Sequence, residues 1–184
     1  VILGGGIDLS VGSQISLVTL IAANTMTDSP IIIILSLLLC LGAGVGFGTL
    51  NGLLVQKMSI PPLIVTLCTS FIFQGLAYTL HKTTGGYIPS SFQIALTRSW
   101  GLFSIPFLLF LGFVGIEFYL LYRTRFGRYI YALGGNEEVL ANAGISVGRI
   151  KVSTYVIAGL MAAMTGLYLA ARVKSGGALY GVPF

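Results

Sequence analysis

The chain has 184 residues, of which 55% are hydrophobic and only 8% are charged, and its mean hydropathy is +0.95. A soluble domain of ordinary composition carries roughly 25% charged residues, because its surface must face water. The composition therefore excludes an ordinary soluble globule. The net charge of +5 does not indicate nucleic-acid binding, because the basic residues lie in short segments between apolar runs and form no patch with interleaved aromatic residues.

Five apolar intervals predict five membrane-spanning helices, since a spanning helix needs about 20 mostly apolar residues. Helices are expected because an open sheet edge would leave backbone groups unpaired in hydrocarbon. The fold class is therefore all-α, a polytopic transmembrane bundle with a single domain over residues 1–184. Because Val1 starts inside an apolar stretch without an initiator Met, we expect the chain to be a piece of a larger protein. The predicted spans are 9–26, 31–55, 61–80, 104–122 and 151–171.

The first span is preceded by "GGGIDLS" (4–10), a motif that predicts a broken helix. Glycines such as Gly6 allow a tight or left-handed backbone. Asp8 and Ser10 are good N-cap residues, and the positive end of the helix dipole favours a carboxylate there. Capping accounts for this helix-break motif without any ligand, and a functional role for Asp8 is the alternative.

The second span contains "GAGVGFGTLNG" (42–52), which places Gly44, Gly48 and Gly52 on one helix face. Small residues at this spacing let two helices approach closely in lipid. The same glycines do not form a phosphate-binding loop, because such a loop needs a strand before it and a helix after it. No GxxxxGK[ST] motif occurs in the sequence. If transport is driven by ATP, a separate subunit must hydrolyse it.

The sequence favours a transport protein over an enzyme. It contains no His, Cys, Asp and Glu cluster at metal-ligand spacing and no nucleophile–base pair, so we expect no metal, no catalytic residue and no cofactor bound by this chain. Several polar side chains within or at the ends of the spans are candidates for a substrate path, although each also suits a hydrogen bond between helices. These candidates are Asn24, Asn51, Thr66, Thr69, Gln74 and Tyr78.

Two segments between spans are long, and their charges predict the orientation. Six basic residues flank or occupy 56–60 and 123–151, against four on the other side, which places the loop 123–150 in the cytoplasm and the polar, Gly/Pro/Ser-rich loop 81–103 in the periplasm. The second loop is expected to carry a short surface helix. Glu117 is the one acidic residue well inside a span, and it is either a carboxylate reaching toward the cytoplasmic interface or an ion site of a secondary transporter.

The loop 123–150 predicts a short capped helix on the cytoplasmic face. Gly134 and Gly135 are expected to break the chain, Asn136 to occupy an N-cap position, and Glu137 and Glu138 to lie in the favoured first turn. A helix of about two turns is not stable alone in water, so a partner packing on it is indicated, with a helix lying on the membrane as the alternative. Leu140 and Ala143 lie in the predicted helix, and Gly144 suits the left-handed position after it.

Three stretches resemble signature segments of the ribose/xylose/arabinose-type ABC importer permeases: "GGIDLSVGS" (5–13), "LNGLLVQKMSIPPLIVTLCT" (50–69) and "RTRFGRYIYALGGNEEVLANAGISV" (123–147). The resemblance implies a bacterial inner-membrane permease that imports a monosaccharide. It also implies a second permease subunit, a cytoplasmic ATP-binding subunit and a periplasmic sugar-binding protein, with no nucleic-acid partner. The segment from Gly135 to Gly144 resembles the coupling helix that contacts the ATPase. An ion-coupled carrier using Glu117 and a non-transporting membrane scaffold are the competing hypotheses.

Overall fold

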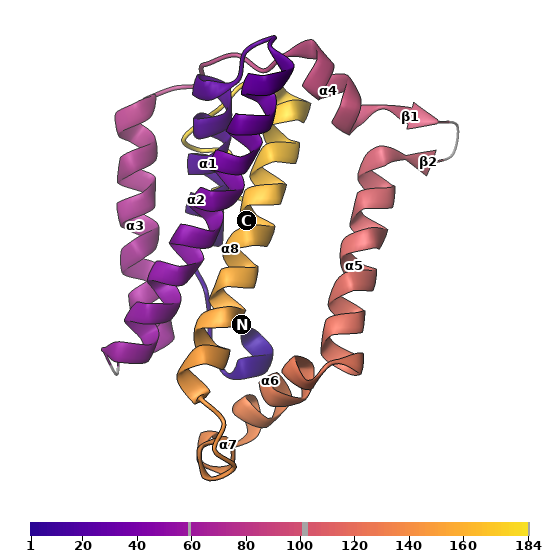
Figure 1. Cartoon of the computed structure of the whole chain (residues 1–184). Coiled ribbons are helices and arrows are strands. Elements are labelled where there is room, and N and C mark those ends of the chain that lie inside the picture. Colours follow the sequence, from indigo (N-terminus) through magenta and orange to yellow (C-terminus); the bar gives the residue numbers. More distant parts are fainter. Residues whose placement is uncertain (59, 101–102, 184) are drawn as a thin grey trace.

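The computed structural model describes residues 1–58, 60–100 and 103–183, and within these ranges the chain forms an all-α bundle (Figure 1). One two-residue hairpin is the exception, with Ser99 paired to Ser104 in antiparallel register. The elements in chain order are η1 (Ile2–Gly4), α1 (Val11–Thr25), α2 (Pro30–Lys57), α3 (Pro62–Leu80), α4 (Ser90–Thr97), β1 (Ser99–Trp100), β2 (Phe103–Ser104), α5 (Ile105–Arg123), α6 (Arg125–Gly135), α7 (Glu137–Asn142) and α8 (Val147–Val173).

Four described helices are long and apolar enough to cross a membrane: α2, α3, α5 and α8. They confirm the predicted spans at 31–55, 61–80, 104–122 and 151–171. Proline occupies the first turn of α2 and of α3, as Pro30 and Pro62. This position suits proline, because the first N–H groups of a helix have no intrahelical partner.

The helix at the first predicted span differs from the expected one. α1 has 15 residues, which at 1.5 Å per residue gives about 22 Å, short of the roughly 30 Å hydrocarbon core. It is also the most enclosed helix, with ten buried residues. α1 packs on α2, α3 and α8, so its apolar character reflects a position inside the bundle.

The centre of the bundle is a close contact between α2 and α8, and the glycine face predicted from the sequence forms it. A Cβ on Gly44 would lie 2.5 Å from the carbonyl oxygen of Gly159, and a Cβ on Gly52 would lie 2.8 Å from the Cα of Val152. A Cβ on Gly48 would overlap the backbone of Tyr155. Because no side chain fits at these points, the two backbones touch directly.

The bundle has two ends, which we name after the short helices that mark them. At the α4 end lie the α1–α2 connection, α4 and the segment after α8; at the α7 end lie the α2–α3 connection, α6 and α7 (Figure 1). The basic residues assigned to the cytoplasm lie at the α7 end, and those assigned to the periplasm lie at the α4 end. α5 stands apart from the bundle and has no buried residue, whereas α1 and α8 are buried along much of their length (Figure 1).

The loop 81–103 contains the short helix expected from the sequence, and this helix packs on the bundle. Phe92 of α4 is buried in a core cluster that includes Ala163 and Leu167 of α8. Backbone hydrogen bonds join Gly85 to Gly176 in both directions. The α4 end is therefore tied to the end of α8, and residues 101–102 of the loop lie outside the described part.

Candidate functional site

The α6–α7 junction departs from the sequence prediction in one respect. α6 runs through Gly134 and Gly135, so these glycines do not break the chain, and the break falls at Asn136. Gly134 has a packing role, since a Cβ there would overlap the carbonyl of Leu3. The glycine lets η1 pack directly on α6, and the helix persists because that contact supports it.

Asn136 ends α6 and begins α7. Its backbone N–H donates to the carbonyl of Ala132, and its side-chain oxygen accepts from the N–H of Glu138 at 2.8 Å. The N-cap prediction is confirmed, and so is the left-handed residue after the helix, since Gly144 has φ 73°. Ala143 is the C-cap, so α7 has six residues and is shorter than the predicted two turns.

Two contacts hold α7 on the bundle. Leu140 is only 3% exposed, whereas its neighbours along α7 are exposed. Glu137 forms an ion pair with Lys151 in the second turn of α8, at 2.5 Å between Oε1 and Nζ. α7 is therefore fixed to the end of a spanning helix that packs along α2.

The outward face of α7 is free in the described chain. Glu138, Val139, Ala141 and Asn142 are exposed, and Val139 is 60% exposed. Val139 is therefore an apolar side chain that the described chain leaves largely uncovered. Val139 lies within the segment from Gly135 to Gly144 that resembles a coupling helix, but only the structure shows that its side chain faces outward.

α6 is an amphipathic helix beside this face. Its buried residues Gly127, Ile130 and Leu133 face the bundle, while Arg125 and Arg128 are exposed. Thr124 caps the helix by accepting a hydrogen bond from the N–H of Gly127. The arrangement places positive charge on the exposed face of α6, in its first turn.

The helix-break motif lies between η1, which packs on α6, and the start of α1. Gly5 has φ 76°, which confirms the left-handed backbone expected there. Ser10 is the N-cap residue of α1, but its side chain makes no capping bond. Instead, Asp8 Oδ1 accepts from the N–H of Ser10 at 2.9 Å and from its hydroxyl at 2.6 Å. Asp8 thus caps this end, and Ser10 has a different role.

The hydroxyl of Ser10 is the centre of a buried polar cluster. It accepts one hydrogen bond from Gln14 Nε2 and one from Asn51 Nδ2, each at 2.7 Å, while it donates to Asp8. Ser10, Gln14 and Asn51 are fully buried. We define Asp8, Ser10, Gln14, Asn51 and Tyr155 as the Ser10 cluster; Tyr155 belongs to it because its hydroxyl lies against Gly6, where a Cβ would come within 2.8 Å.

Sequence reasoning missed Gln14 and Tyr155. Gln14 lies one turn after Ser10 in α1, and a glutamine at i+4 from a serine inside an apolar helix was a signal that could have found it. Tyr155 lies far away in the sequence and carried no comparable signal.

The six proposed substrate-path residues are divided among three places. Asn51 and Thr66 lie near the start of α1, where Thr66 Oγ1 accepts from the N–H of Leu9; Thr69 is buried one turn further along α3. Gln74 donates to the carbonyl of Ala178, and Asn24 meets His81 at the α4 end. Tyr78 is 40% exposed. None of the six lines any of three cavities, of about 120, 140 and 510 Å³, in the described structure, and their role in transport stays a prediction.

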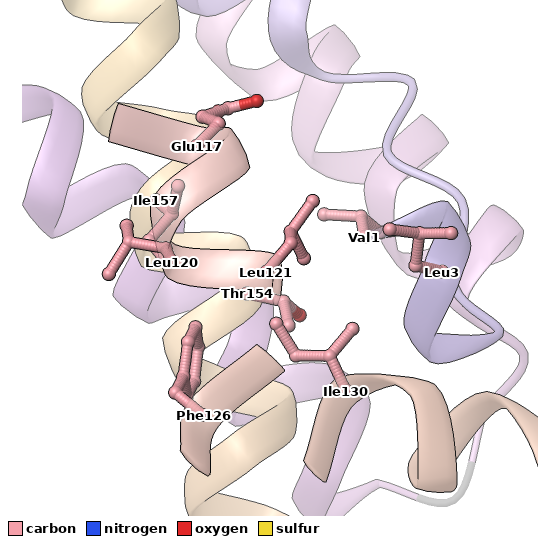
Figure 2. Close-up of a pocket in the computed structure, with 9 residues that line it drawn as sticks. All are labelled: Val1, Leu3, Glu117, Leu120, Leu121, Phe126, Ile130, Thr154 and Ile157. Carbon is pink, nitrogen blue, oxygen red and sulfur yellow. The ribbon is translucent and has the colours of Figure 1, made fainter. Parts of the chain in front are cut away.

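Glu117 lies at the rim of a cavity of about 120 Å³ between α5, α6, η1 and α8 (Figure 2). The other side chains are apolar apart from Thr154, and Glu117 lies across the cavity from Phe126 (Figure 2). Glu117 is exposed, and no hydrogen bond or ion pair joins it to another described residue. The hydroxyl of Thr154, the other polar side chain that lines the cavity, donates to the carbonyl of Lys151.

Comparisons with known proteins agree with this architecture. The family model described as "Branched-chain amino acid transport system / permease component" matches residues 1–184. The ribose import permease protein RbsC of Bacillus subtilis is 39% identical, over 95% of this chain and 55% of its own length. The inner membrane ABC transporter permease protein YjfF of Escherichia coli is 35% identical, over 99% of this chain and 56% of its own length.

The L-arabinose transport system permease protein AraH of Escherichia coli is 36% identical, over 94% of this chain and 52% of its own length. The chain thus spans about half the length of the curated relatives it matches. No solved structure matches the chain.

Proposed function

The chain belongs to the branched-chain amino acid transport system / permease component family, and we propose that it is the permease subunit of an ATP-binding-cassette importer for a monosaccharide. The family and the four long apolar helices make it a multi-pass membrane protein. The printed names of its relatives support a sugar as substrate, because two of them carry ribose and arabinose. Inward transport, a pentose or hexose substrate and a bacterial inner-membrane location are parts of the proposal.

The observation that carries the proposal is the attachment of α7. A six-residue helix is too short to persist alone in water, yet it is capped at both ends, and Leu140 and the Glu137–Lys151 pair hold it on α8. Its outward face is left exposed. A rigidly mounted, uncovered helix suits a cytoplasmic ATP-binding subunit whose movement must reach the membrane helices.

The mechanism follows from the connection between α7 and the bundle. A displacement of α7 acts on Lys151 in the second turn of α8, and α8 contacts α2 along the seam of Gly44, Gly48 and Gly52. Since no side chains separate these backbones, α2 and α8 move together, as in rigid-body transitions of packed domains. ATP is hydrolysed by the partner subunit, a second permease subunit completes the pore, and a periplasmic sugar-binding protein supplies the substrate.

The test uses the full-length protein reconstituted with its ATP-binding subunit and binding protein. Val139→Asp places a charge on the outward face of α7 and is expected to reduce ATPase co-purification and uptake of labelled ribose or arabinose by at least tenfold. The matched control is Leu179→Asp, which makes the same kind of change at an exposed residue of the α4 end and is expected to leave ATPase binding unchanged. Unchanged ATPase binding in Val139→Asp, with the protein still folded, contradicts the proposal.

The alternative is an ion-coupled secondary transporter that uses Glu117. It predicts uptake that is abolished by an uncoupler and by Glu117→Gln, and that does not need the ATPase. The ABC importer predicts ATP-dependent, uncoupler-insensitive uptake that survives Glu117→Gln.

A further inference from the structure

Four buried polar atoms of the Ser10 cluster have no hydrogen-bond partner in the described structure: Asp8 Oδ2, Gln14 Oε1, Asn51 Oδ1 and the hydroxyl of Tyr155. Gln14 and Asn51 are fully buried, and Tyr155 is 2% exposed. Leaving a buried polar atom unpaired costs about 1–3 kcal/mol, so buried polar groups almost always have partners. Several unpaired atoms around one hydroxyl therefore indicate a binding site for a small ligand.

The hydrogen bonds of Ser10 determine which atoms are left over. A serine hydroxyl has one proton, and here Asp8 Oδ1 receives it at 2.6 Å. The hydroxyl oxygen is then an acceptor toward both amides, so Gln14 and Asn51 must present their NH₂ groups to it. Their carbonyl oxygens are left unpaired. The Ser10 hydroxyl thus accepts hydrogen bonds from both NH₂ groups, and the amide carbonyl oxygens remain without a partner.

Each of these unpaired oxygens lies close to the Ser10 hydroxyl. Within an amide or carboxylate the two polar atoms are about 2.2 Å apart, so the free oxygens of Asp8, Gln14 and Asn51 all lie within about 5 Å of the Ser10 hydroxyl. They come from the segment before α1, from α1 and from α2, and Tyr155 adds a hydroxyl from α8. One carboxylate oxygen, two amide carbonyl oxygens and a phenol oxygen are the donor set that hard cations bind in proteins.

The charge of the cluster points to a monovalent cation. Asp8 contributes the negative charge, and no basic side chain is its partner within the described residues. Asn51 lies about 9 Å along α2 from Lys57, and Tyr155 lies about 6 Å along α8 from Lys151, so the cluster lies deeper in the bundle than these basic residues of the α7 end. An unpaired charge at that depth is costly, and one positive charge neutralises it.

A cavity lies beside Tyr155 at the α7 end of the bundle. This cavity, of about 140 Å³, is lined by Gly4, Gly5 and Gly6 on one side and by the Glu137–Lys151 pair on another. Tyr155 lines the same cavity, and its hydroxyl lies against Gly6, two residues before Asp8. The side chain of Tyr155 therefore borders both the cavity and the segment that leads to Asp8.

We propose that the Ser10 cluster binds an alkali cation, Na⁺ or K⁺, through Asp8 Oδ2, Gln14 Oε1 and Asn51 Oδ1, with the hydroxyl of Tyr155 at its edge. The cation neutralises Asp8 and joins α1 to α2 and α8 at the point where α1 begins. The site goes beyond the proposed transport function and does not depend on it, because the cluster is the same whatever substrate the protein carries.

The test measures the thermal unfolding midpoint of the full-length protein in detergent, in NaCl, KCl or choline chloride at equal ionic strength. The midpoint is expected to rise by about 5–10 °C between cation-free and saturating conditions, and to rise with cation concentration. A response to Na⁺, to K⁺ or to both identifies the cation. Equal midpoints in all three salts overturn the proposal.

Two variants make the test specific. Asp8→Asn keeps the acceptor for Ser10 and replaces the free oxygen by an NH₂ donor, so the protein is expected to fold and to lose its cation response. Asp28→Asn, at the α4 end, is the matched control and is expected to keep the full response. A cation response that survives in Asp8→Asn overturns the proposal.

Tyr155→Phe removes only the unpaired hydroxyl. If a cation is bound, the variant requires several-fold more Na⁺ or K⁺ to reach the same midpoint. A protein that is stabilised by Tyr155→Phe and indifferent to cations has an empty cluster. A protein that is destabilised by it but indifferent to cations holds water only, and either result rules out the cation site.

Discussion

Glu137, in the first turn of α7, and Lys151, in the second turn of α8, form an ion pair at 2.5 Å between Oε1 and Nζ. The pair links the helix proposed to bind the ATPase to a helix that crosses the membrane. Both side chains are partly exposed, at 53% and 26%, respectively. Because water screens such pairs, the contribution of this ion pair to stability is small. We expect it instead to transmit movement from α7 to α8.

The ion pair can be tested by exchanging its charges. Lys151→Glu places two acids together and is expected to lower ATP-dependent uptake several-fold, while global stability changes by less than about 1 kcal/mol. Adding Glu137→Lys restores opposite charges and should recover most of the uptake. If the double variant is no better than the single one, the pair does not transmit movement.

The α2–α8 seam predicts opposite effects for two glycines of the same helix. A Cβ on Gly48 would overlap the backbone of Tyr155, so Gly48→Ala is expected to destabilise the protein by about 1–3 kcal/mol through overpacking. A Cβ on Gly46 would meet nothing within 4 Å, and Gly46→Ala should be neutral or stabilise by up to about 1 kcal/mol. Thermal unfolding of the two variants checks this, and equal midpoints would contradict the seam.

Variants at Leu140 and Val139 are expected to distinguish the attachment of α7 to the bundle from its docking on the ATPase. Truncating a fully buried leucine costs about 2–5 kcal/mol, which is enough to release a six-residue helix, so Leu140→Ala should speed hydrogen exchange at residues 137–143 and weaken ATPase binding. Val139→Ala should leave exchange unchanged and still weaken ATPase binding, since Val139 is exposed. Slow exchange in Leu140→Ala would show that other contacts hold α7.

The Tyr87–Asp28 contact at the α4 end predicts a pH effect. The Tyr87 hydroxyl donates to Asp28 Oδ1 at 2.9 Å, and this hydrogen bond, together with the Asp28 charge, raises the pKa of Tyr87 above its usual range. The stabilisation is fully present below the ordinary tyrosine pKa of about 10 and is lost as the pH rises through the raised pKa. The difference in tyrosinate absorbance between wild type and Tyr87→Phe measures this titration, and Asp28→Asn should move it to lower pH.

Span positions were predictable because hydrocarbon imposes a length and an apolar composition on any helix that crosses it. The prediction for α8 began four residues late, at Lys151, because counting between charges stops at a basic residue, while a helix end at the membrane surface accepts one. The length of α1 was less predictable. An apolar interval identifies a helix that avoids water, but it does not distinguish a lipid-facing helix from one enclosed by other helices.

The caps of α7 and the glycine face of α2 were determined by the sequence itself, because caps depend on residues within one turn and a helix face depends only on the helical period. The tertiary structure alone decided that Gly134 packs against Leu3 and that Ser10 joins Asp8, Gln14 and Asn51. Ser10 and Asn51 are 41 residues apart, and Tyr155 is more than 100 residues further along the chain. Such contacts depend on how whole helices pack, and no local pattern specifies that packing.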